Sequence, residues 1–352
     1  MNLYLALALA ALLSFGIAFA LGYVVIPFLH KLSFGQTILD IGPKWHKDKQ
    51  GTPIMGGTMF IISTLVSFGL IALIDHLCGG KIIVVNDIVS DSMKVKLFAG
   101  IIMALGFAFI GFLDDYIKAV KKRNMGLSIK QKSILQIIVM LGYLLTLYLD
   151  NPTGAMFIPF IGMVETKIFF WVIGIIVIYC TTNAVNFTDG VDGLCASVTA
   201  AAAACFIVIA GLRNCFGASL LSASLMGGLV GYVIWNWHPA KVMMGDLGSM
   251  FLGGMIVALA YAVDCPFIIL LVGIIYVAEF GSDIIQIGYF KLTHGKRIKK
   301  NGKSILFLIQ ESFNIVFNLL RFIYFPPYLI FLIFILNYQN RKVPKMPNPA
   351  YL

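Results

Sequence analysis

Residues 3–27 read LYLALALAALLSFGIAFALGYVVIP, a continuous apolar run without one charged side chain. A helix that crosses the hydrocarbon core of a bilayer needs about 20 apolar residues, so this run is long enough to span a membrane. No Lys or Arg precedes it, and it is longer than the apolar part of a signal peptide. We therefore expect a first transmembrane helix whose N-terminus lies outside the cell.

Similar runs recur along the whole chain. Of its 352 residues, 60% are hydrophobic and 12% are charged, whereas a soluble protein carries about 25% charged residues. Continuous runs favour helices over the short alternating segments of a membrane β-barrel. The sequence predicts an all-α, polytopic integral membrane protein of about ten transmembrane helices. The runs lie at residues 3–27, 54–74, 97–113, 133–149, 167–182, 194–212, 218–235, 250–263, 267–290 and 315–337.

The formal net charge of +10 raises nucleic acid as a partner, but the placement of the charge argues against it. With the N-terminus outside, the predicted inward loops hold 17 Lys and Arg residues and the outward segments hold 8. This is the positive-inside distribution of membrane proteins. The basic charge therefore orients the chain and faces anionic lipid and phosphate, and we expect no nucleic acid partner.

Five of the 16 acidic residues gather in three short segments of the predicted inward loops. Ionisable groups close to a membrane are costly and are usually functional. The first segment holds Asp114 and Asp115. Because neighbouring helical positions point about 100° apart, we expect one of them to face a site and the other a lysine or a helix end. A solvated helix terminus is the simpler alternative.

The second segment, residues 183–194, reads NAVNFTDGVDGL and follows a run of hydrocarbon side chains. Its Asn186, Asp189 and Gly193 recur at helical spacings, which predicts a polar face directed into a cavity. In the third segment Asp246 stands between two glycines at a predicted helix start. There a carboxylate either approaches a metal or a diphosphate, or caps the helix, and the sequence leaves both open.

Together these segments predict a site for phosphoryl-group transfer. Oxygen ligands without a set of His and Cys residues select a hard cation such as Mg²⁺. Of the five scattered histidines, only His46 and His294 fall in loops of interest, and no Ser or Cys has an adjacent base. Carboxylates, a hard cation and lysines at a membrane surface suit transfer to an anionic lipid. The lysines and arginine of that face are Lys44, Lys47, Lys49, Lys118, Lys121, Lys122, Arg123, Lys130 and Lys132.

At these residues the chain resembles the polyprenyl-phosphate N-acetylhexosamine-1-phosphate transferases. The matching segments stand in family order over residues 1–298. Residues 51–57 and 286–297 favour the branch whose donor is UDP-N-acetylmuramoyl-pentapeptide over relatives that use UDP-GlcNAc. The segments are GPKWHK at 42–47, GTPIMGG at 51–57, DDY at 114–116, residues 183–194, WN at 235–236, KVMMGDLGS at 241–249, SDIIQ at 282–286 and KLTHGKR at 291–297.

The resemblance implies a Mg²⁺ ligand at Asp246 and four catalytic carboxylates around it, Asp114, Asp115, Asp189 and Asp192. It also implies residues that contact the nucleotide sugar or position those carboxylates: Lys118, Lys130, Asn183, Asn186, Asn236 and Gln286. The implied acceptor is undecaprenyl phosphate, with UMP released and the first lipid intermediate of peptidoglycan formed. A one-step and a covalent aspartyl-phosphate mechanism both stay open. The implied setting is the bacterial plasma membrane, with both termini outside, a cytoplasmic active site and a possible homodimer.

Residues 299–352 depart from the family. Its histidine-rich motif should fall near 305–307, where this chain has Ile305, Leu306 and Phe307, followed by an apolar segment and a basic tail. The end is either an aberrant replacement or the solution of a divergent member. Two alternative functions therefore stay open, transfer from UDP-GlcNAc and a membrane protein with impaired catalysis. A lipid transporter is disfavoured because the acidic residues lie at helix ends on one predicted side.

Overall fold

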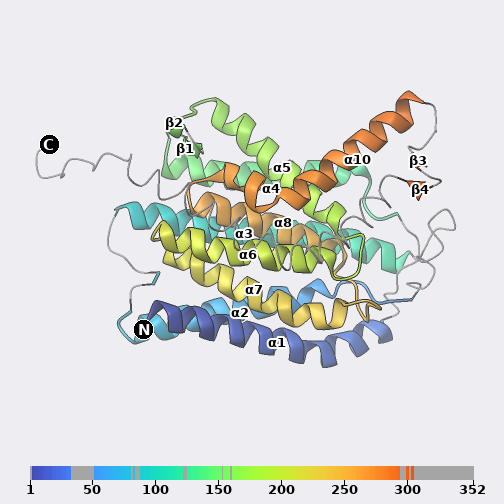
Figure 1. Ribbon diagram of the computed structural model, residues 1–352, viewed down its shortest axis with the longest axis horizontal. Coiled ribbons are helices and arrows are strands. Elements are labelled where there is room, and N and C mark those ends of the chain that lie inside the picture. The colour runs from blue at the N-terminus through green and yellow to red at the C-terminus, as the bar shows by residue number, and fades with distance from the viewer. Residues whose placement is uncertain are drawn as a thin grey trace, which may run out of the picture. The chain divides into compact units, whose positions relative to one another are not determined.

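The computed structural model describes residues 2–32, 51–80, 82–83, 88–121, 125–152, 154–158, 161–293, 299–300 and 303–304. Helices dominate this part of the chain, and short strands form two small pairs (Figure 1). The first helices are α1 (Leu3–Lys31), α2 (Gly57–Leu77), α3 (Ile88–Val120), α4 (Ile129–Asp150), α5 (Phe169–Thr188), α6 (Leu194–Leu212), α7 (Phe216–Asn236) and α8 (Gly245–Ala262). The turn η2 (Pro266–Ile268), α9 (Ile269–Val272) and α10 (Ile274–Leu292) follow. The strands are β1 (Ala155–Ile158) with β2 (Gly162–Glu165), and β3 (Lys299–Lys300) with β4 (Lys303–Ser304).

Within the described residues, eight helices, α1 to α8, are long and apolar enough to cross a membrane. The prediction of an all-α polytopic membrane protein is thereby confirmed. The ninth predicted run is divided among η2, α9 and α10, and α10 also carries Glu279, Asp283 and Lys291. The tenth run, residues 315–337, lies outside the described residues.

The chain divides into two compact units. One comprises residues 1–156 and 165–280, and the other comprises residues 157–164 and 281–352. The predicted division at residue 298 rests on the resemblance and stays a prediction. All eight candidate spans and all three acidic segments belong to the first unit.

Helix α8 is the most buried span of this unit. In its most apolar stretch 89% of the residues are buried, against 22% for α1. It packs against α3 and α5, and α1 lies beside α7 and α2 (Figure 1). Ala10, Ser14 and Ala18 are buried at four-residue intervals along α1, the pattern of small residues that lets membrane helices approach closely. The polar side chains of α8 are thus held inside a close-packed group of helices.

Several helices continue beyond the apolar runs into the polar segments. Helix α3 extends to Val120 and includes both Asp114 and Asp115, and α8 begins at Gly245, one residue before Asp246. The expectation that a loop begins at Asp114 and Asp115 is therefore wrong, because the helical backbone hydrogen bonds of α3 continue where the hydrophobicity ends. Asp246 lies at a helix start, as predicted.

Candidate active site

The first acidic pair belongs to the last turns of α3, and both carboxylates are buried. Asp114 forms an ion pair with Lys118, one turn further along the helix, at 2.5 Å, and its other oxygen accepts a hydrogen bond from the Leu127 amide at 2.8 Å. Asp115 accepts a hydrogen bond from the amide of Leu247 at 3.0 Å. Lys118 and the start of α8 are the lysine and the helix end that were expected. However, both carboxylates also reach the same site.

Asp246 lies in the first turn of α8, next to Gly245, whose φ of +72° favours glycine. It does not cap its own helix, because the N-cap is Met244 and Asp115 satisfies the free amide of Leu247. The Asp246 carboxylate instead accepts hydrogen bonds from Lys118 at 3.1 Å and Lys132 at 2.9 Å. Of the two roles that the sequence left open, the structure excludes helix capping.

Asp114, Asp115 and Asp246 form what we call the aspartate cluster. One oxygen from each lies within 4.8 Å of the others, and it is the group of possible metal ligands found among the described residues. The ammonium of Lys118 lies among them, 2.5, 3.8 and 3.1 Å from Asp114, Asp115 and Asp246. The cluster therefore already surrounds one positive charge. Three hard oxygen donors at this spacing fit Mg²⁺, which binds through one or two carboxylates plus substrate oxygens.

Lys132, the fourth residue of α4, is a member of the site that the sequence did not distinguish from its neighbours. Its ammonium is 2.9 Å from Asp246, whereas the predicted Lys130 is exposed at the start of the same helix. A capping box between Ser128 and Gln131 fixes where α4 begins and hence which lysine faces the cluster. This capping box was the feature of the sequence from which Lys132 could have been predicted to face the site.

Two asparagines of α5 lie next to the cluster. Asn186 donates a hydrogen bond to Asp246 at 3.1 Å and one to Ser249 at 2.7 Å. Asn183, one turn earlier, pairs with Gln136 of α4 at 3.4 Å and donates to the Tyr179 carbonyl at 2.8 Å. The predicted polar face is therefore present for these two residues. Asn186 contacts Oδ1 of Asp246, whereas Lys118 and Lys132 contact Oδ2.

The helical spacing does not continue to Asp189 and Gly193. Helix α5 ends at Thr188, Asp189 is its C-cap, and Gly193 has a φ of +74° before α6 begins. Asp192 accepts hydrogen bonds from His238 at 3.0 Å and the Ala240 amide at 3.3 Å. The group of three carboxylates includes neither Asp189 nor Asp192. The structure therefore places both between the end of α5 and the start of α6, and His238 is a partner of Asp192 that the sequence did not single out.

Asn236, at the end of α7, is buried with 1% of its surface exposed. Its side chain accepts a hydrogen bond from the Gly193 amide at 2.9 Å and donates one to the Val242 carbonyl at 2.8 Å. It ties the loop before α6 to the loop before α8. Of its two implied roles, positioning fits this environment. The side chain of Gln286 lies outside the described part of the chain, as do His46 and His294.

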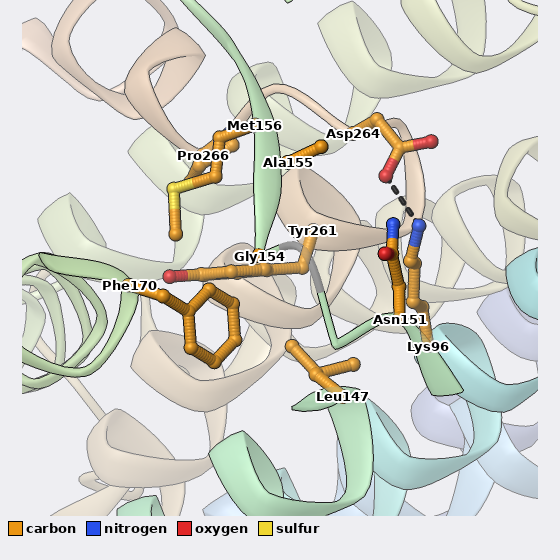
Figure 2. Close-up of a pocket in the computed structure, with 10 residues that line it drawn as sticks. All are labelled: Lys96, Leu147, Asn151, Gly154, Ala155, Met156, Phe170, Tyr261, Asp264 and Pro266. Carbon is orange, nitrogen blue, oxygen red and sulfur yellow. Dashed lines mark hydrogen bonds and ion pairs between the residues drawn. The ribbon is translucent and has the colours of Figure 1, made fainter. Parts of the chain in front are cut away.

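A recess (Figure 2) lies where α3, α4, α5 and α8 meet, at the helix ends that face away from the aspartate cluster. Its wall includes Lys96 of α3, which forms an ion pair with Asp264 at 2.5 Å, and Tyr261 of α8. Lys96 and Asp114 are about 27 Å apart along α3, given a rise of about 1.5 Å per residue. The recess is therefore distinct from the aspartate cluster, which lies near the other membrane surface.

The cluster remains accessible although it is partly enclosed. The side chains of Lys118 and Asp246 keep 29% and 22% of their surface exposed, whereas those of Asp114 and Asp115 keep 5% and 3%. Together with the ammonium groups of Lys118 and Lys132, the three carboxylates of the cluster give the site one formal negative charge. This arrangement can hold a divalent cation and bring lysines to the oxygens of an anionic substrate.

A family model described as Glycosyl transferase family 4 matches residues 97–264, the range that contains the cluster, Lys132 and Asn186. The helical membrane fold and this match define a membrane-embedded glycosyl transferase. The chain is 37% identical over 296 residues to the phospho-N-acetylmuramoyl-pentapeptide-transferase of Listeria monocytogenes serovar 1/2a, covering 81% of this chain and 85% of that protein. It is 40% identical to the proteins of the same name from Halalkalibacterium halodurans over 295 residues (84% and 86%) and Acetivibrio thermocellus over 294 residues (82% and 82%). The chain belongs to the phospho-N-acetylmuramoyl-pentapeptide-transferase family and is a transferase.

Proposed function

We propose that the chain transfers phospho-N-acetylmuramoyl-pentapeptide from its UDP carrier to undecaprenyl phosphate, with Mg²⁺, at the cytoplasmic surface of the bacterial plasma membrane. The observation that carries the proposal is the convergence of Asp114, Asp115 and Asp246 around one positive charge. The family to which the chain belongs supports the choice of donor. The excess of basic residues in the predicted inward loops supports the cytoplasmic side.

Mg²⁺ would be held by Asp246 with Asp114 and Asp115 beside it, and it would lower the cost of charge that develops on the diphosphate. Asn186 keeps the Asp246 carboxylate oriented through its hydrogen bond at 3.1 Å. Lys118 and Lys132 are near enough to Asp246 to reach a diphosphate placed against it. The chain's own residues thus bind and align the donor while they neutralise its charge.

In the proposed step, an oxygen of undecaprenyl phosphate forms a bond to the sugar-side phosphorus of the donor. The bond from that phosphorus to the bridging oxygen breaks, and UMP leaves with the electron pair. A phosphate monoester has its second pKa near 6, so the acceptor is largely ionised at neutral pH. A base is therefore helpful at most, and Asp114 or Asp115 would orient the acceptor or take up its last proton. Attack by an aspartate, with a covalent phosphoryl intermediate, is the competing scheme.

The test measures UMP release by the purified chain, with and without Mg²⁺, for the natural sequence and for Asp246→Asn. We expect the substitution to lower the rate about a hundredfold or more, since it removes a charge from the site where transition-state charge is stabilised. Asp150→Asn is the matched control, because Asp150 hydrogen-bonds Ser92 at the opposite end of α4. Equal rates for the natural sequence and Asp246→Asn would overturn the metal assignment, and faster release from UDP-GlcNAc would overturn the donor.

A further inference from the structure

An aromatic surface lies where α7 packs against α1. Trp235 of α7 donates a hydrogen bond from its indole nitrogen to the Phe19 carbonyl at 3.1 Å. Its ring stacks on Phe19, with centroids 5.7 Å apart, and meets Tyr23 edge-on at 4.8 Å. Tyr23 is 63% exposed. The indole is therefore fixed to α1, while one side of this aromatic group faces the surroundings of the helix bundle.

Lys241 places a positive charge on the same group. Its backbone amide donates a hydrogen bond to the Trp235 carbonyl at 2.9 Å, so the chain after α7 folds back toward the indole. The ammonium then lies 5.3 Å from the centroid of the Trp235 ring, within the range of a cation–π interaction. The side chain is nevertheless exposed. We call Phe19, Tyr23, Trp235 and Lys241 the aromatic–lysine surface.

The position of this surface matches the boundary between hydrocarbon and headgroups. Lys241 precedes Asp246 by five residues and follows the end of α7, so it lies near the same membrane surface as the aspartate cluster. Aromatic rings and lysines at that depth are typical of membrane interfaces. Neither α1 nor α7 contains an acidic residue, and α1 adds His30 and Lys31 in its last turn. The charge of this surface is therefore complementary to an anion.

We propose that the aromatic–lysine surface binds an anionic phospholipid of the bilayer, with the phosphate at Lys241 and an acyl chain along Tyr23 and Phe19. The cation is held in place by a backbone hydrogen bond and a ring, so its charge is oriented before the lipid arrives. One lysine close to an anionic lipid surface contributes about 1 kcal/mol, which corresponds to about a fivefold preference for anionic over zwitterionic lipid. The proposal is independent of the transfer reaction.

The experiment uses Trp235 as its own reporter. In the full chain with Trp45, Trp171 and Trp237 replaced by Phe, the fluorescence of Trp235 is quenched by brominated phosphatidylglycerol or brominated phosphatidylcholine in mixed micelles. We expect half-maximal quenching at about fivefold less phosphatidylglycerol. Lys241→Gln should abolish this preference, and Lys241→Arg should keep it. Lys121→Gln is the matched control, an exposed lysine just after the end of α3 on the same membrane side.

A second measurement covers the case in which the triple Phe background does not fold. Native mass spectrometry of the otherwise natural chain then compares retained phosphatidylglycerol in the Lys241→Gln and Lys121→Gln variants. Equal quenching by the two lipids, or equal lipid retention by the two variants, would overturn the proposal. Displacement of phosphatidylglycerol by a small mole fraction of undecaprenyl phosphate would also overturn it, because the surface would then belong to the acceptor. If the natural chain prefers phosphatidylglycerol but releases no UMP, the proposed function alone is contradicted.

Discussion

At the scale of the residue, Lys132 is a member of the site that the structure adds to those predicted from the sequence. Its ammonium is 2.9 Å from Asp246, while Lys130 is exposed. We expect Lys132→Met to lower the turnover number for UMP release about 10- to 100-fold, since a hydrogen bond to a charged group contributes about 1.5–3 kcal/mol. Lys130→Met should cause a smaller loss. A greater loss for Lys130→Met would show that the lysine implied by the resemblance, and not the one beside Asp246, serves the reaction.

The acidic residues could be found from the sequence because charge is rare in an apolar chain, but their contacts could not. The Asp115 carboxylate bonds the Leu247 amide, and Lys132 pairs with Asp246, across more than a hundred residues of sequence. Such contacts depend on how α3, α4 and α8 pack, which no local pattern contains. The spacing from Asn186 to Gly193 misled for a local reason, because the left-handed conformation of Gly193 follows a helix that has already ended.

At the scale of the element, helix positions were the most predictable feature. The apolar run 194–212 coincides with α6, and the run 218–235 lies within α7, because the thickness of the bilayer imposes a minimum apolar length. The run 97–113 falls short of α3 at both ends. The additional turns carry polar residues, whose helical state is stabilised by tertiary contacts and not by hydrophobicity. Hydropathy therefore located the spans but not the helix ends that build the site.

Close packing of α2 against α8 yields an element-scale prediction from two glycines of one helix. A Cβ atom at Gly57 would lie 2.8 Å from the Gly248 nitrogen and 3.1 Å from the Met244 carbonyl, whereas one at Gly69 would meet nothing within 4 Å. We expect Gly57→Ala to lower the free energy of unfolding by about 1–3 kcal/mol through overpacking. It should also lower activity, since the start of α8 carries Asp246. Gly69→Ala should leave both unchanged or add slightly to helix stability.

Thermal unfolding in detergent and UMP release measure the two effects on the same samples. A Gly57→Ala protein as stable and as active as Gly69→Ala would mean that the start of α8 can move without consequence. In that case the position of Asp246 would not depend on the contact between α2 and α8.

At the scale of the whole molecule, the sequence predicts that residues 299–352 depart from the family. We expect exchange of residues 299–352 for the C-terminal segment of the Halalkalibacterium halodurans relative to raise UMP release about tenfold or more. The family's histidine motif is expected to hold donor phosphates, and one such charged contact contributes about 1.5–3 kcal/mol. The same exchange combined with Asp246→Asn should stay inactive. An unchanged rate would indicate that residues outside that motif perform its task in this chain.

The orientation of the chain in the membrane can be tested with a native cysteine. All six cysteines lie in the described part, and Cys78 is the exposed one, at the C-cap of α2. Gly57, at the other end of α2, is hydrogen-bonded to Met244 beside the aspartate cluster. The helix of 21 residues spans about 31 Å, so Cys78 and the cluster lie near opposite membrane surfaces.

The positive-inside distribution predicts that Cys78 lies outside the cell. A membrane-impermeant maleimide should therefore label Cys78 in intact bacterial cells and leave Cys78→Ser unlabelled. In the Cys78→Ser background, Lys121→Cys should react only after permeabilisation. The reverse pattern would place the aspartate cluster on the outer face, where the proposed cytoplasmic transfer could not occur.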